Sequence, residues 1–152
     1  MIRRVAAVMM AAAAAATALS AQPQAAGTVW DGVYSAAQAR RGEQVFKSEC
    51  SYCHRDDLSG GFFDGGALQA PALAGPHAFG SSFVERWKDL SVGEMVAAIA
   101  SAMPQQKPSS LTLQQYVDVV SYLFERNDVP AGPSELAVDV AALGEILITT
   151  KR

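Results

Sequence analysis

Hydrophobic residues recur at helical spacing in three stretches of the chain, and each stretch follows a residue suited to cap a helix. Ser35, Ser91 and Thr112 are each followed three residues later by Gln or Glu, which is the capping-box pattern. The first helix is predicted over residues 36–49, and the other two begin after Ser91 and Thr112. Their apolar faces consist of Gly42 and Phe46; of Val92, Met95, Val96 and Ile99; and of Tyr116, Val119, Val120, Leu123 and Phe124.

The ends of these helices and the segments between them are also marked in the sequence. Pro104 ends the second helix, and Asn127 with Pro130 ends the third. Residues 58–75 are rich in Gly and Pro and are predicted to form a long loop. Residues 143–149 are the one short candidate strand. The pattern therefore predicts an all-α domain.

The N-terminus has the features of a secretory signal peptide. Two arginines precede an apolar run over residues 5–19, and small residues follow it. We expect a signal peptide over residues 1–21, with cleavage after Ala21 preferred to cleavage after Ser20. An uncleaved anchor is the alternative, but the apolar run is short for a membrane span. The mature protein is predicted to be periplasmic, without stable membrane insertion.

The rest of the chain divides into three parts. Residues 22–34 are predicted to be a leader, disordered over residues 22–28. Residues 35–129 form the predicted domain, and residues 130–152 form a C-terminal extension. The extension has an apolar patch over residues 136–148. Packing on the domain is preferred to a role as a partner-binding tail, because exposed apolar patches are uncommon on soluble monomers.

Size and charge narrow the class of protein. The 152 residues are enough for one hydrophobic core, and the formal net charge is −3. Removal of Arg3 and Arg4 with the signal peptide leaves the mature chain at about −5. No run of basic residues is present, which argues against nucleic acid as a partner.

The segment Cys50-Ser51-Tyr52-Cys53-His54 is the C-x-x-C-H attachment motif of a c-type haem. The two thiols add to the two vinyl groups of haem, and the adjacent imidazole becomes the proximal ligand of the iron. These are the only two cysteines in the chain, so a disulfide framework does not compete for them. The motif predicts one covalently bound haem c, with His54 as an iron ligand.

Two other uses of these residues are weaker. A thioredoxin-like dithiol would follow a β-strand, whereas a helix is predicted before Cys50. A zinc site needs four ligands, and the chain offers only Cys50, Cys53, His54 and His77. Binding of the neighbouring residues Cys53 and His54 to one small ion would be strained.

Methionine is a common second axial ligand of a c-type haem. Beyond the predicted signal peptide the candidates are Met95 and Met103. Met95 is in register with the apolar face of its helix, which favours a place in the core. Met103 precedes Pro104, and a residue before proline is shifted towards an extended conformation. We therefore favour Met103; Met95, His77 or an open sixth position are the alternatives.

The chain resembles the class I c-type cytochromes from about Trp30 to Leu136. The resemblance is carried by the haem motif and by the following segments: Gly42-x-x-x-Phe46, Pro71-Ala72-Leu73, Met103-Pro104 and Tyr122-Leu123. It implies a small cytochrome c fold of about four helices around the haem, with long loops. It also implies His54 and Met103 as axial ligands, a Pro71 carbonyl that accepts from His54, and packing of Tyr122 against Gly42.

A narrower resemblance concerns function. Residues 30–34 and 57–61 are similar to single-haem cytochromes found with periplasmic quinoprotein dehydrogenases.

The chain departs from the class I cytochromes at two places. Residues 62–68 form a longer segment than is usual in that family, and residues 108–110 lack the glycine that relatives often carry after the proline. Arg86 and Trp87 are candidates to contact a haem propionate, although Phe83 and Trp87 equally suit a core pair.

These observations predict an electron carrier without catalytic chemistry of its own. It would accept electrons from a dehydrogenase, of the quinoprotein type by resemblance, and pass them to a terminal oxidase. One alternative is a cytochrome subunit bound tightly in a dehydrogenase or oxidase complex. Another is a sensor or enzyme with an open sixth position.

Overall fold

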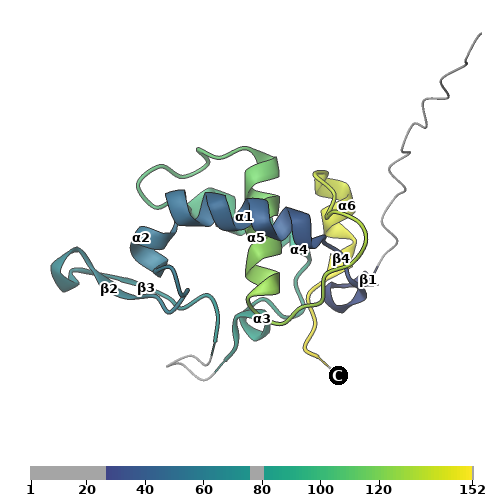
Figure 1. Cartoon of the computed structure of the whole chain (residues 1–152), viewed down its shortest axis with the longest axis horizontal. Helices are drawn as coiled ribbons and strands as arrows, with labels where there is room; N and C mark the ends of the chain where they lie inside the picture. Colours follow the sequence, from purple (N-terminus) through teal and green to yellow (C-terminus); the bar gives the residue numbers. More distant parts are fainter. Residues whose placement is uncertain (1–26, 76–80, 152) are drawn as a thin grey trace, which may run out of the picture.

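A computed structural model describes residues 27–75 and 81–151 of the chain, and the described part is mainly helical, as predicted (Figure 1). Three of its helices are long and three are single turns. The helices are α1 (Ala36–Glu49), α2 (Ser51–His54), α3 (Phe83–Arg86), α4 (Val92–Ala102), α5 (Leu113–Glu125) and α6 (Val140–Gly144). The predicted signal peptide lies outside the described residues.

The capping predictions are confirmed for two of the three long helices. Ser91 with Glu94 and Thr112 with Gln115 form complete capping boxes at the starts of α4 and α5. At α1, Ser35 accepts from the Gln38 backbone, but the return half of the predicted box is not formed. The Gln38 side chain instead bonds both backbone groups of Leu136, at 3.0 and 2.7 Å. A contact with a distant segment therefore replaces the local one.

Helices α1 and α5 cross each other in the centre of the molecule (Figure 1). A Cβ atom on Gly42 would lie 1.8 Å from the Asp118 carbonyl oxygen and 3.0 Å from Tyr122 Cβ, so glycine is needed for this approach. The Phe46 and Tyr122 rings pack beside the crossing with centroids 5.4 Å apart. The predicted close approach at Gly42 is confirmed.

The predicted long loop after the haem motif contains a small β-hairpin. Strands β2 (Gly61–Phe63) and β3 (Leu68–Ala70) pair antiparallel, with a 3₁₀ turn over Asp64–Gly66 between them. The prediction of a loop without strands is wrong here, because the paired segments have three residues each and are too short to show an alternating pattern. The hairpin projects from the helical body beside α2 (Figure 1).

The two ends of the described chain pack together. Strand β1 (Gly27–Thr28) pairs in parallel with β4 (Ile146–Leu147), and the indole of Trp30 donates to the Thr149 carbonyl at 2.7 Å. The predicted disorder is thus wrong for Gly27 and Thr28, which are held by a segment far away in sequence. The candidate strand over residues 143–149 is reduced to two residues, preceded by α6.

The C-terminal segment covers the helices with apolar side chains. Its buried members are Leu136, Leu143, Ile146 and Ile148. Gly144 of α6 lies against Gly93, where an added Cβ would be 3.1 Å from the Gly144 nitrogen. Arg41 of α1 bonds Asp118 of α5 at 3.1 Å and Glu135 at 2.8 Å. The extension is thus packed on the domain, and it supports α4, the helix that directly precedes Met103.

Candidate haem site

A cavity of about 420 Å³ lies between the haem motif, the hairpin and helices α3, α4 and α5. It brings together five residues singled out in the sequence: Cys50, Cys53, His54, Pro71 and Met103. Most of the remaining wall is apolar and includes Phe46, Phe63, Phe83, Trp87, Ile99, Val119 and Leu123. A concave, largely apolar cavity with a few placed polar groups is the usual form of a cofactor site.

The single turn of α2 places the haem motif on one wall of this cavity. Cys53 and His54 both donate backbone N–H groups to the Cys50 carbonyl, at 3.2 and 3.0 Å. This bonding closes the turn that holds the two thiols and the imidazole together. All three residues line the cavity.

His54 is buried and its ring is fixed by one hydrogen bond. Its Nδ1 lies 2.9 Å from the Pro71 carbonyl oxygen. Because a carbonyl can only accept, Nδ1 carries the hydrogen in this contact. Burial lowers the pKa of His54, although the bond to Pro71 opposes this effect. Both the lowered pKa and the hydrogen on Nδ1 favour the neutral ring whose Nε2 lone pair is available to a metal.

The Cys50 thiol does not have the lowered pKa of a reactive dithiol. Burial raises the pKa of the Cys50 thiol to about 11, with smaller contributions from Glu49 and Cys53. A reactive dithiol depends on a lowered thiol pKa, which is the opposite shift. Among the described residues, no three His, Cys, Asp or Glu side chains are arranged to hold a metal ion. His77, the fourth zinc ligand considered above, lies outside them.

Met103 follows directly after α4 and has the extended backbone predicted for a residue before proline, with φ −127° and ψ 150°. Its N–H donates to the Ile99 carbonyl at 2.8 Å, and its carbonyl accepts from the Tyr116 hydroxyl at 2.8 Å. The residue lines the cavity. Met95 is fully buried in the core and does not belong to the cavity wall.

Comparison with known families agrees with this geometry. The family described as cytochrome c oxidase, cbb3-type, subunit III matches residues 37–123, which is more than half of the chain. The chain belongs to this family of c-type cytochrome domains. No match was found among curated proteins or among solved structures.

Membership fixes the fold class and the cofactor. The chain has the small all-α cytochrome c fold and carries covalently bound haem c, and its cytochrome domain serves haem-based electron transfer. The resemblance to class I c-type cytochromes is thus confirmed at the level of the domain.

The residues present fit a haem. The cavity offers two thiols within one helical turn, an imidazole and an apolar wall. Arg86 also lines it and lies over the Phe83 ring, with its guanidinium 5.7 Å from the ring centroid, and donates to the Ala72 carbonyl. Among the described residues, no carboxylate forms an ion pair with Arg86. A cation at an apolar cavity suits a cofactor with carboxylate groups.

Three features of the site were not predicted from the sequence. Tyr116 was assigned to an apolar helix face, yet its hydroxyl holds the Met103 carbonyl. Lys107, in the segment after Met103, pairs with Glu49 at 2.7 Å, and this ion pair links the segment to the end of α1. Phe63 lines the cavity from the unpredicted hairpin. Each depends on a contact between distant segments, for which the local pattern carries no signal.

Proposed function

We propose that this protein is a periplasmic electron carrier with a single haem, held by Cys50 and Cys53 and ligated by His54 and Met103. The observation that supports this most is that all four residues line one cavity. The chain has one attachment motif and no further cysteine, which limits covalent attachment to one haem.

The surrounding residues would prepare the site for electron transfer. The Pro71 carbonyl holds the His54 ring in one tautomer, which directs Nε2 towards a metal. Tyr116 fixes the backbone that carries the Met103 thioether. The haem supplies a reversible one-electron couple of iron. If His54 and Met103 both ligate the iron, no position on it would remain for a substrate, and the protein would be a carrier without catalytic chemistry of its own.

The proposed electron donor is a periplasmic dehydrogenase, of the quinoprotein type, and the proposed acceptor is a terminal oxidase. Support for the donor comes from the resemblance of residues 30–34 and 57–61 to cytochromes that accompany such dehydrogenases. The acidic balance of the chain, −3 overall and about −5 without the predicted signal peptide, favours partners with a basic contact surface. In the described part of the chain, no helix has the length and apolar character to cross a membrane.

Mixing the oxidised protein with a quinoprotein dehydrogenase and its substrate tests the proposal. We expect reduction of the haem within the turnover time of the enzyme, and a rate that falls as salt is raised. No reduction by the dehydrogenase, in a protein that dithionite reduces fully, would rule out this donor.

A second candidate function is that of a subunit bound within an oxidase complex. The family description, which names an oxidase subunit, favours it. Gentle detergent extraction from the native cell followed by native gel electrophoresis separates the two functions. A free carrier migrates alone with its haem, whereas a subunit remains with the other chains of the complex.

A further inference from the structure

The β2–β3 hairpin exposes large apolar side chains beside the haem cavity. Phe62 is 65% exposed and Leu68 is 41% exposed, while Tyr52 of α2 is 72% exposed. Single exposed apolar residues are normal, but a group of them around one small element is typical of an interaction surface. The hairpin extends outward from the helical body, so a second protein has access to it (Figure 1).

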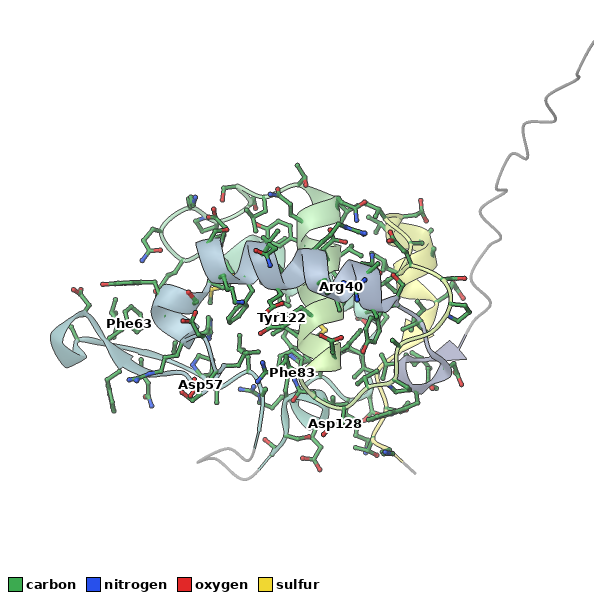
Figure 2. All side chains as sticks on the ribbon, viewed as in Figure 1. Arg40, Asp57, Phe63, Phe83, Tyr122 and Asp128 are labelled. Atoms are coloured by element: carbon green, nitrogen blue, oxygen red, sulfur yellow. The ribbon has the colours of Figure 1, made fainter. Side chains whose placement is uncertain are left out.

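The strand register separates these side chains into two faces. Phe63 and Leu68 are directly opposite each other in the ladder, so their side chains share one face. Phe62 and its partner Gln69 belong to the other face. Tyr52 joins the first face, because its ring packs edge-on against Phe63 at 6.1 Å. Figure 2 shows Phe63 on the side of the hairpin that faces α2.

We call Tyr52, Phe63 and Leu68 the docking face. Phe63 also lines the haem cavity, so a single aromatic ring belongs both to the cavity wall and to this face. Tyr52 is the residue before Cys53, one of the two attachment cysteines. A protein bound to the docking face would therefore lie close to the haem, as electron transfer requires.

The charged side chains in the segment that carries the hairpin are mainly acidic. The segment over residues 55–70 carries Arg55 and three aspartates, Asp56, Asp57 and Asp64, all exposed. None of these aspartates belongs to a salt bridge of the described residues. Two lysines near this part of the molecule are already paired with glutamates. Lys47 pairs with Glu43, and Lys107 pairs with Glu49. The docking face is thus apolar, and the segment over residues 55–70, which carries the hairpin, is acidic overall.

We propose that the docking face binds a redox protein whose contact surface is apolar and edged by basic residues. The inference rests on the electron-transfer function and adds the place and chemistry of the contact. Small apolar interfaces with complementary charge at the edge suit short-lived electron-transfer complexes.

A cationic, apolar oxidant tests this surface. Tris(phenanthroline)cobalt(III) takes one electron from the ferrous protein and becomes the cobalt(II) complex, so its rate of reduction reports contact near the haem. Loss of one apolar side chain from the docking face removes part of its contact area, so Tyr52→Ser and Leu68→Ser should each slow this reaction about fivefold. Phe62→Ser is the control, since Phe62 is an aromatic residue, 65% exposed, on the opposite face of the same hairpin.

Reduction of the ferric variants by hexaammineruthenium(II), a cation without apolar ligands, separates docking from electron transfer itself. We expect the wild-type rate in all three variants. A wild type that exchanges electrons with neither complex would overturn the electron-transfer function. Normal exchange with both complexes, and equal oxidation by cobalt in all three variants, would overturn only the docking face.

A binding measurement without electron transfer gives a second readout. Tris(phenanthroline)chromium(III) is paramagnetic and should broaden the amide signals of residues 63–68 in the wild type, and several-fold less at the same concentration in Leu68→Ser. Val140 and Leu147, which are 68% and 49% exposed on the C-terminal segment, provide the comparison. Equal broadening at these two residues and at the hairpin would show non-specific contact and would overturn the proposal.

Discussion

The two walls of the haem cavity that carry the proposed axial ligands are built in different ways. On the proximal wall, Cys50, Cys53 and His54 share one helical turn, closed by their own backbone bonds. On the distal wall, Met103 follows α4 and is held by Tyr116 of α5. Neighbours in sequence organise the first wall, whereas separate helices organise the second. The distal wall should therefore respond more strongly to changes elsewhere in the fold.

Removal of the two thiols should have the largest effect on the proximal wall. In Cys50→Ala/Cys53→Ala the protein loses both covalent bonds to the haem, so denaturation should release the cofactor. Mass spectrometry of the denatured chain from a host with cytochrome c maturation should show no haem adduct. Met103→Ala should retain one adduct per chain. A haem adduct in the double variant would contradict the attachment through these cysteines.

The α1–α5 crossing supports both walls, because α1 leads into the motif and α5 carries Tyr116. In Gly42→Val the new side chain meets the Asp118 backbone, and we expect the free energy of unfolding to fall by about 3 kcal/mol. Denaturant unfolding of the haem-containing protein measures the change.

Gly144→Ala is the control for this substitution. A Cβ atom there meets nothing within 4 Å, so stability should be unchanged or slightly raised. Equal stability of Gly42→Val and the wild type would mean that the helices do not cross at Gly42.

A smaller change should affect the distal wall alone. Tyr116→Phe removes the hydrogen bond to the Met103 carbonyl, which is worth about 1 kcal/mol. If Met103 ligates the iron, this loss should raise the affinity of the ferrous protein for carbon monoxide about fivefold, because the competing ligand is held less firmly.

Tyr122→Phe is the matched control, because that hydroxyl accepts only a long bond of 3.4 Å from Arg126. Carbon monoxide affinity should remain at the wild-type value in this variant. A similar rise in both variants would indicate a general loosening of α5 and not a specific role of Tyr116.

The same contrast explains which parts of the molecule were predictable. The haem motif, two capping boxes and the extended backbone of Met103 are local features, and the sequence patterns indicated them correctly. Gly42 was also predictable, because a glycine on an apolar helix face indicates a close approach.

The missed features depend on tertiary contacts. The Gln38 side chain was predicted to cap α1 and instead bonds Leu136, which lies 98 residues away in sequence. The hairpin consists of two three-residue strands in a segment rich in Gly, so its composition suggested a loop. The disorder predicted around Gly27 is replaced by pairing with β4 near the other end of the chain.

The central claim, ligation of the haem by His54 and Met103, is tested most directly by the ferric absorption spectrum of two methionine variants. Met103→Ala should lose the iron–sulfur charge-transfer band at the red end of the spectrum and should bind carbon monoxide once reduced. Met95→Ala, which changes a buried core residue outside the cavity wall, should keep the band. Loss of the band in Met95→Ala and its persistence in Met103→Ala would contradict the proposed ligation.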